Sequence, residues 1–598
     1  MRPARREFLL RFVRILPVIV AGPPRTAFSG LLPAVDSGRP IPSGPDLGRF
    51  GGLSLSVGPP TGFFRVEKTG NRWILVDPEG HPFWMLSVDA VDWNLGGKVG
   101  LEAAKAKYGE KGLGPKFGEH AVNRLRAWGL NSLGPYATTY ALPVPMYGSW
   151  QGCPVKLPFI RTIRPSYYST IPRGNALPEP VKVLISGALD PRVYKGWPGH
   201  FPDLFDPKYV EAAKCYAGEL YGGNEKAHYT RNGAMGGIPH PSLVNEPWLL
   251  GSMTDESDTI FGFGPGPEMP TVDGKLHPHL GWVAAVTKPT QMENDAVAAN
   301  YGTRLKVQYR DPAVYTKIAW RDYVKQKYGE ISALNRAWGS HYTTFDSDGG
   351  WPEGHGLMDE SGRNAWIGAD GDRLSTARPA VKEDLDAFLG IVAERYYQVT
   401  SGAVRAATPH HLIITSMNNH GGLIRRPILR ATGKYCDLIE LTLTAQLPEV
   451  ARITYEETRR PLVGFLLKTA NKDSYFSSRP PLTVFDFPTQ EKRAEAYRET
   501  LEFLYAFQAS DGMHPVVGIE LWDYIDKWAE QANSGLVTAR DNAYDGREDV
   551  VAGGTDPWGY PTGGEERDYG DFITGVRAAN TAVLDRLKQD LSRRGARA

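Results

Sequence analysis

The sequence predicts an α/β protein built on a (β/α)8 TIM barrel, with an N-terminal β-hairpin and a long insertion after the fourth strand. Short apolar runs alternate with longer amphipathic segments along much of the 598 residues, which is typical of buried parallel strands and covering helices. Several runs end in acidic, amide or aromatic side chains. Strands of this barrel present such side chains at the end where chemistry takes place.

Two segments precede the expected barrel. Residues 1–30 predict an export signal, because Arg5-Arg6-Glu7-Phe8-Leu9-Leu10 resembles the twin-arginine pattern and an apolar run follows it. Arg14 and Pro17 interrupt this run, which is too short to span a membrane. Residues 31–60 are rich in Pro, Gly and Ser and predict a linker. We therefore expect an exported chain, periplasmic or extracellular, with no membrane insertion in its mature form.

The barrel is expected to cover residues 61–545. Two runs, 62–67 and 72–77, flank Thr69-Gly70-Asn71 and predict the hairpin. The eight barrel strands are expected at 81–89, 130–134, 157–163, 248–253, 412–417, 437–442, 461–467 and 515–522. Covering helices are expected at 121–128, 208–221, 381–407 and 491–509.

The chain between strands four and five is longer than a simple barrel needs, which predicts an insertion at about 264–380. It contains helical patterns at 315–328 and 331–338, and a Gly- and Asp-rich piece, 349–370, that is expected to form a loop over the site. Residues 546–598 are expected to be a C-terminal extension that packs on the barrel.

Composition argues against several classes of partner. The 68 basic residues balance 67 acidic ones without a basic stripe, so a nucleic-acid partner has no electrostatic support. Cys153, Cys215 and Cys436 are odd in number and lack metal-ligand spacing, so we expect no disulfide framework, no metal and no cofactor. Fifteen Trp and 28 Tyr supply many flat aromatic faces, although packing in the core is the ordinary role of any single one.

Scattered motifs are typical of one group of enzymes. They are the hairpin Trp73–Pro82, the motif Trp128-Gly129-Leu130-Asn131, the segment Tyr328–Gly339, and strand eight followed by Asn533-Ser534-Gly535-Leu536-Val537. With them the chain resembles the retaining glycoside hydrolases of clan A, and most of all the family-50 β-agarases and the family-42 β-galactosidases. The resemblance implies a (β/α)8 enzyme that cleaves O-glycosidic bonds of a poly- or oligosaccharide.

The resemblance implies a general acid/base glutamate at the end of strand four, usually just after Asn. Glu246 has this form in Asn245-Glu246-Pro247, but only two apolar residues precede the motif. Glu256 follows the full apolar run 248–253 and has Asp255 before it. Because a barrel strand needs several buried residues before its catalytic end, we favour Glu256 over Glu246.

The resemblance also implies a nucleophilic glutamate at the end of strand seven, yet 461–467 contains no acid. A retaining mechanism needs two carboxyl groups about 5 Å apart, whereas about 6.5–9.5 Å suits an inverting one. Glu520 in strand eight and Glu440 in strand six can supply the second carboxyl. Each interrupts an apolar strand, where an ionised carboxylate is costly unless it is paired or lines a site.

Other side chains at predicted strand ends suit sugar recognition, because aromatic rings stack on pyranose faces while amides and carboxylates bind hydroxyls. The substrate-binding candidates are Asp89, Asn131, Tyr136, Asp255, Asn418, Asn419, His420, Trp522, Tyr524, Asp526 and Trp528. A lone histidine such as His420 is more often structural than catalytic. As a group at strand ends, these residues are harder to explain by packing alone.

Three hypotheses follow. The first is an exported glycoside hydrolase with Glu256 as general acid/base and with Glu520 or Glu440 as nucleophile or base. The second is a catalytically altered, carbohydrate-binding barrel, supported by the acid-free strand seven. The third is a metal-dependent sugar enzyme that uses strand-end acids and His420, which ranks last because recognised ligand spacing is missing. The sequence does not predict the sugar, the linkage or the oligomeric state.

Overall fold

The structure is a computed structural model. It describes residues 46–111, 113–145, 152–169, 180–185, 201–223, 241–254, 311, 313–349, 354–359, 379–415, 426–443, 447–471, 485–527, 533–543, 554–555, 561–562 and 569–595. Within these ranges, no helix combines the length and the apolar composition that crossing a membrane requires.

A ring of eight parallel strands forms the centre of the molecule. In chain order they are β4 (Met85–Val88), β5 (Ser132–Leu133), β6 (Phe159–Ile163), β9 (Leu249–Thr254), β10 (Leu412–Thr415), β11 (Ile439–Thr442), β12 (Leu462–Asn471) and β14 (Val516–Trp522). The spatial order is β10-β9-β6-β5-β4-β14-β12-β11. A parallel bridge between Ile414 and Leu438 joins the two ends of this order, so the ring closes into the expected (β/α)8 barrel.

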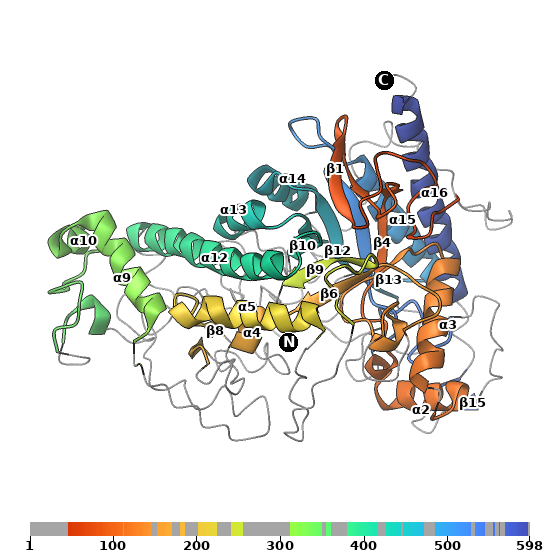
Figure 1. The fold of residues 1–598 in the computed structure, drawn as a ribbon, viewed down its shortest axis with the longest axis horizontal. Helices are drawn as coiled ribbons and strands as arrows, with labels where there is room; N and C mark the ends of the chain where they lie inside the picture. The colour runs from red at the N-terminus through yellow and green to blue at the C-terminus, as the bar shows by residue number, and fades with distance from the viewer. Residues whose placement is uncertain are drawn as a thin grey trace.

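Helices surround the ring (Figure 1). They are α2 (Gly97–Tyr108), α3 (Leu113–Ala127), α4 (Pro165–Ser169), α5 (Pro207–Gly222), α12 (Pro379–Ala407), α13 (Arg426–Tyr435), α14 (Leu447–Thr458), α15 (Gln490–Ala506) and α16 (Tyr569–Gly595). Their starts follow local chemistry. Asp206 accepts a hydrogen bond from the Lys208 amide at the start of α5, and Thr489 does the same for the Lys492 amide in α15.

Smaller elements complete the described fold. They are β1 (Arg65–Thr69), β2 (Arg72–Val76), β3 (Pro82–Phe83), β7 (Val183–Ile185), β8 (Phe201–Pro202), β13 (Phe485–Phe487), β15 (Gly554–Thr555), β16 (Pro561–Thr562), and the short 3-10 helices η1 (Trp93–Gly96), η2 (Thr139–Ala141) and η4 (Leu357–Asp359). The pair β1–β2 is the predicted antiparallel hairpin.

The barrel strands pack closely because their side chains are apolar and small where backbones approach. All six residues of β9 and all four of β10 are buried. Gly518 of β14 lies so close to β4 that an added Cβ would be 2.4 Å from the Cβ of Met85. Only glycine permits this approach of the two strands.

Residues 46–60 are the described part of the segment 31–60 that was expected to be a linker, and they pack on the barrel. Phe50 and Leu53 are buried there, and the Phe50 ring lies 4.5 Å from that of Trp248. The Leu53 amide also donates to the carbonyl of Pro82. Apolar side chains within this Pro- and Gly-rich segment therefore dock it against the barrel.

The C-terminal helix α16 lies along α15 (Figure 1). The Tyr497 hydroxyl donates to the Asn580 side-chain oxygen at 2.6 Å, and the Asn580 amide donates to the Trp128 carbonyl at 3.1 Å. This helix therefore connects α15 with the turn that follows α3.

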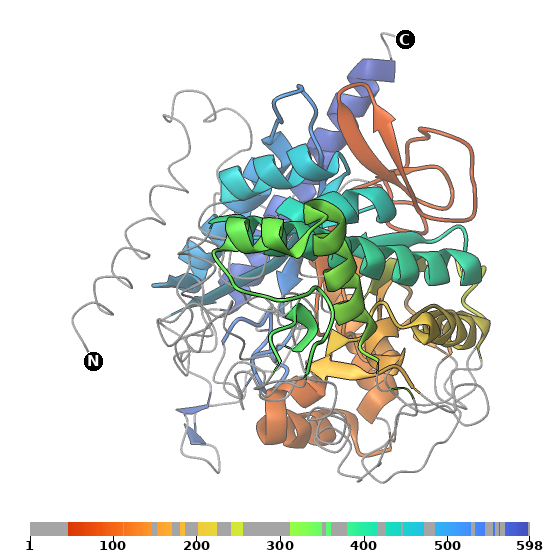
Figure 2. The same ribbon diagram turned by 90° about the vertical axis from the view of Figure 1, so that its left-hand side faces the viewer.

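The insertion after β9 contributes α9 (Tyr315–Tyr328) and α10 (Ile331–Trp338), with the bounds that the sequence predicted. Both lie beside the start of α12 and away from the barrel, and Figure 2 shows them in front of it. Asp203, which follows β8, accepts hydrogen bonds from the amides of Tyr315 and Thr316 at 2.7 and 2.8 Å and so caps α9.

A buried carboxylate on α12 anchors the helices α9 and α10. Asp384 accepts hydrogen bonds from the Tyr328 hydroxyl at 2.7 Å and the Trp338 indole at 2.8 Å, and it also pairs with Lys327. Asp384→Leu is expected to weaken the attachment of α9 and α10 by about 3 kcal/mol, because buried donors lose a charged acceptor. Hydrogen exchange of the α9 and α10 amides measures the loss. Glu383→Leu, at an exposed position of the same helix, should leave the exchange unchanged.

Candidate active site

Three acidic residues come from three barrel strands and are fully buried. Asp89 directly follows β4, Glu440 belongs to β11, and Glu520 lies two residues before the end of β14. Glu520 is level with Ser87 of β4, which is level with Ser132 of β5. Asp89 and Glu440 both act electrostatically on Glu520. The fold therefore gathers the side chains of Asp89, Glu440 and Glu520 in one part of the barrel, and these three residues are called the buried acid cluster below.

Glu520 is the member with the clearest electrostatics. Burial, followed by the nearby Asp89 and Glu440, raises its pKa well above the ordinary value. Neither carboxyl oxygen has a hydrogen-bond partner among the described residues. Gly134, directly after β5, makes room for it, because an added Cβ would lie 2.8 Å from Oε2 of Glu520. A charge so placed is costly, which favours the protonated form of Glu520.

Asp89 is tied to the chain around it. Its Oδ1 accepts a hydrogen bond from the Ala90 amide at 2.5 Å. Its own amide donates to the Leu521 carbonyl, and its carbonyl accepts from the Tyr524 amide. The position of Asp89 thus depends on the end of β14 and on the loop that follows.

That loop contains side chains that the sequence analysis missed. Lys527 is nearly buried, with its ammonium 3.5 Å from the Asp523 carboxylate and 3.8 Å from the centre of the Trp522 ring. Asp523 also accepts a hydrogen bond from the Ser534 hydroxyl at 3.0 Å, while Asp526 accepts from the Gly535 amide at 2.8 Å. Trp522, a candidate for sugar stacking, therefore has Lys527 on one face, and Asp526 helps to hold the loop.

Arg493 of α15 fixes the same loop from outside. Its buried guanidinium donates to the carbonyls of Ser534 and Gly535 and to the Thr469 hydroxyl of β12. It also lies 3.8 Å from the centre of the Phe572 ring on α16. A buried arginine on a helix, with partners far along the chain, leaves no signal in the sequence.

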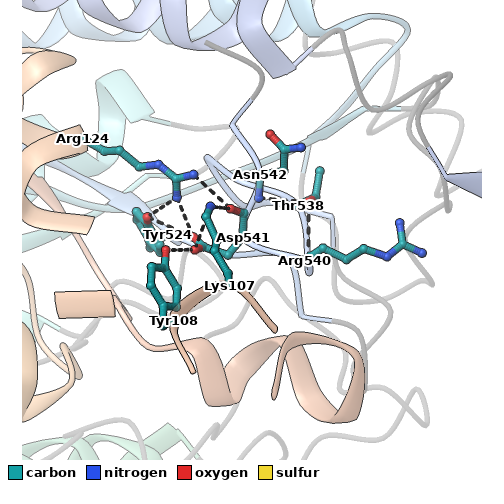
Figure 3. Close-up of polar contacts among 8 residues, drawn as sticks. All are labelled: Lys107, Tyr108, Arg124, Tyr524, Thr538, Arg540, Asp541 and Asn542. Carbon is teal, nitrogen blue, oxygen red and sulfur yellow. Dashed lines mark hydrogen bonds and ion pairs between the residues drawn. The ribbon is translucent and has the colours of Figure 1, made fainter. Parts of the chain in front are cut away.

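The Tyr524 side chain lies beside residues of α2 and α3 (Figure 3). Its hydroxyl bonds to Arg124 of α3 at 2.9 Å and to Asp541 at 3.3 Å, and Arg124 pairs with Asp541 at 2.5 Å. Tyr108 and Lys107 of α2 complete the network by donating to Asp541. Burial alone would raise the pKa of Asp541, but Arg124 and Lys107 lower it. Tyr524, a predicted substrate-binding residue, therefore uses its hydroxyl in this network.

Glu246 lies at the opposite end of the barrel from Asp89. It precedes β9, which begins at Leu249, and its Oε1 accepts a hydrogen bond from the Trp248 amide at 3.1 Å. Side chains at the amino end of a strand lie far from the carboxyl end, where (β/α)8-barrel enzymes place their active sites. The structure therefore does not bring Glu246 to the buried acid cluster, despite its Asn-Glu motif.

Two other candidates hold positions of their own. The Asn131 side chain accepts from the Leu86 amide and donates to the carbonyls of Trp84 and Gly51, so the backbone uses it at the β4–β5 edge. The Arg164 guanidinium lies 6.0 Å from the centre of the Tyr136 ring. Asp255, Glu256, Asn418, Asn419, His420 and Trp528 lie outside the described residues.

Strand seven is acid-free over its whole observed length, from Leu462 to Asn471. Its final residues pair with the short parallel strand β13, in which Asp486 is level with Ala470. An acidic residue from another segment thus stands beside the carboxyl end of strand seven, a placement that the sequence analysis did not anticipate.

No metal centre is built by the part of the chain that the structure describes, where no cluster of three or more His, Cys, Asp or Glu side chains is arranged to hold an ion. Cys153, Cys215 and Cys436 are all free.

The buried side chain of His411, near Glu246, makes the fold sensitive to acid. Its Nε2 donates to the Glu246 carbonyl at 2.9 Å, and burial, with His410 and Arg405 adding to it, lowers the pKa of His411 to about 4. In the unfolded chain, the His411 side chain takes up a proton near pH 6.5. The contribution of neutral His411 to the free energy of unfolding is therefore complete above about pH 6.5. About 3 kcal/mol of it is lost as the pH falls toward 4.

His411→Gln is expected to flatten the dependence of the unfolding free energy on pH between about 6.5 and 4. Urea titrations of wild type and variant across this range measure the two slopes. Identical slopes would show that His411 does not carry this acid sensitivity.

Fold and site together define a (β/α)8-barrel protein whose interior holds buried carboxyl groups. No family model matches the sequence. β-Agarase B of Vibrio sp. (strain JT0107) is 22% identical over 397 residues, which are 64% of this chain but only 36% of that protein.

Two solved structures are similar in fold. An agarase, AgWH50C, superposes with a TM-score of 0.58 at 17% identity and covers 91% of this chain and 68% of its own. An exo-β-agarase superposes with a TM-score of 0.57 at 18% identity, over 92% of this chain and 68% of its own. These likenesses confirm, at the level of fold, the resemblance to agarases that the sequence motifs indicated.

Proposed function

We propose that this protein is a glycoside hydrolase that cleaves O-glycosidic bonds of an agar-type or other galactose-containing poly- or oligosaccharide. The observation that carries the proposal is the burial of Asp89, Glu440 and Glu520 together, inside a barrel whose fold matches two agarases. Perturbed acids in a barrel of this kind are functional candidates, and paired carboxyl groups are the machinery of glycoside hydrolysis.

The proposed general acid/base is Glu256. The position of β9 supports it, because this buried strand ends at Thr254 and Glu246 precedes its start. The second carboxyl comes from Glu440 or Glu520, since strand seven offers no acid. The carboxyl separation decides the stereochemistry, with about 5 Å giving retention and about 6.5–9.5 Å giving inversion of the anomeric centre.

The proposed substrate contacts are the other strand-end candidates. Trp522 and Trp528 would stack on sugar faces, and Asp255, Asn418, Asn419 and His420 would bind hydroxyls. Asn131, Tyr524 and Asp526 support the site by holding the backbone and loops, in keeping with their hydrogen bonds.

The purified chain should release reducing ends from agarose, from oligosaccharides of agar, or from β-galactosides, and not from cellulose. Chromatography of the products and proton NMR of the first-formed anomer measure cleavage and its stereochemistry. Binding of these glycans without cleavage would favour a carbohydrate-binding barrel instead. If the chain neither binds nor cleaves any galactose-containing glycan, the proposal is overturned.

We also propose that the chain is exported through its Arg5-Arg6 motif. Replacing both arginines by lysine should retain the protein in the cytoplasm of the producing cell, and unchanged export would refute this part.

A further inference from the structure

We propose that Glu520 acts as a neutral carboxylic acid that donates a hydrogen bond to a hydroxyl of the bound sugar, and that it is not the nucleophile. This inference rests on the proposed function and assigns one residue of the same site. It leaves the role of second catalytic carboxylate to Glu440.

The placement of Glu520 is the first argument. The residue is fully buried, and neither of its carboxyl oxygens has a hydrogen-bond partner among the described residues. Buried polar groups in folded proteins are nearly always paired, and an exception calls for a functional explanation. A carboxyl group that faces inward from β14 without a protein partner can bond to a ligand.

The space around Glu520 is the second argument. Gly134 lies against it, and a Cβ there would be 2.8 Å from Oε2 and 3.0 Å from the Val88 carbonyl. The strand neighbours level with it, Ser87 and Ser132, have small side chains. Larger side chains at positions 132 and 134 would therefore fill the space that the Glu520 carboxyl group occupies.

The charges around Glu520 are the third argument. Asp89 from β4 and Glu440 from β11 act on it, both with the sign that favours a proton. In the following loop, Lys527 is paired with Asp523 and lies over Trp522. Among three buried acids, the one that holds a proton cannot attack an anomeric carbon, but it can donate to an oxygen.

Glutamine at position 520 separates the two roles, because its amide donates a hydrogen bond but cannot attack. Glu520→Gln is expected to keep kcat/KM within about tenfold of wild type. Glu520→Leu, which cannot donate, should lower it about 10–100-fold, the usual effect of one lost buried hydrogen bond to a substrate. A loss of about ten-thousandfold or more in Glu520→Gln would overturn the proposal in favour of a nucleophile.

The pH profile gives a second reading. Wild-type kcat/KM should fall on the alkaline side as Glu256 and Glu520 lose their protons, and Glu520→Gln should keep only the part of this fall that Glu256 causes. Glu499→Gln is the matched control, because Glu499 on the outer helix α15 also has a pKa raised by burial. That variant should keep the wild-type profile. An alkaline limb in Glu520→Gln that is identical to that of wild type would contradict the donor role.

Failure of the proposed function is distinguishable from failure of this inference. If wild type cleaves no glycan, the hydrolase proposal fails, and calorimetry with agar oligosaccharides then tests the donor directly. Binding kept in Glu520→Gln and weakened in Glu520→Leu supports it, while equal binding or equal loss in both overturns it. Should Glu520→Leu not fold, Gly134→Ala displaces the carboxyl without removing it. The same rule applies, with weakened sugar binding supporting the donor and unchanged binding refuting it.

Discussion

Glu256→Gln is expected to lower kcat on a galactose-containing glycan about 10²–10⁴-fold, while glycan binding stays close to that of wild type. The amide cannot protonate the leaving oxygen or activate water, and general acid/base catalysis contributes about 10²–10⁴-fold. Initial rates of reducing-end release give kcat, and calorimetry with the same oligosaccharide gives the affinity. A loss of affinity at unchanged kcat would make Glu256 a binding residue.

Glu246→Gln is the informative comparison. Because Glu246 precedes β9 at the far end of the barrel, this variant should keep wild-type activity. The reverse result, an inactive Glu246→Gln and an active Glu256→Gln, would reverse the assignment of the acid/base.

Arg124→Met is expected to lower the free energy of unfolding by about 3–5 kcal/mol, because it leaves the carboxylate of Asp541 buried without its main partner. Both groups are almost fully buried, and they lie 2.5 Å apart (Figure 3). Urea denaturation followed by circular dichroism measures the change. Arg452→Met removes exposed ion pairs to Glu449 and Glu456 on α14 and should leave the denaturation midpoint almost unchanged.

The double variant Arg124→Met/Asp541→Leu tests the cause of that loss. Removing both charges avoids an unpaired buried carboxylate, so the double variant should be more stable than Arg124→Met alone. Purely additive losses would show that packing, and not the ion pair, accounts for the effect.

The barrel was predictable because buried strands leave a local signal. Each of the eight apolar runs contains or overlaps an observed strand. For two strands the difference in length has a clear physical reason. β5 is reduced to Ser132–Leu133 between a turn and Gly134, whereas β12 continues to Asn471 because β13 pairs with its end. The helices α13 and α14 were not predicted, since proline, glycine and β-branched residues weaken their helical pattern.

The site was predictable only in part. An acid inside an apolar strand is visible in the sequence, which is how Glu440 and Glu520 could be selected. The partners of Tyr524 are not visible, because Arg124 and Asp541 are 417 positions apart. Likewise, only the start of β9 shows that the Asn-Glu motif at 246 stands before the strand and not after it.

Two edges of the barrel have short strand pairings. In the described chain, β5 pairs with β6 at Leu133 and Phe159, and β10 pairs with the start of β11 at the bridge of Ile414 with Leu438, beside backbone hydrogen bonds of Ile413 and Thr415. These narrow seams separate β6, β9 and β10 from the other five strands. The three buried carboxyls all belong to the group of five strands, whereas β9, which Glu256 follows in the sequence, belongs to the group of three. Under the proposed function, the pairing at these two seams would therefore set the distance between Glu256 and the second carboxyl.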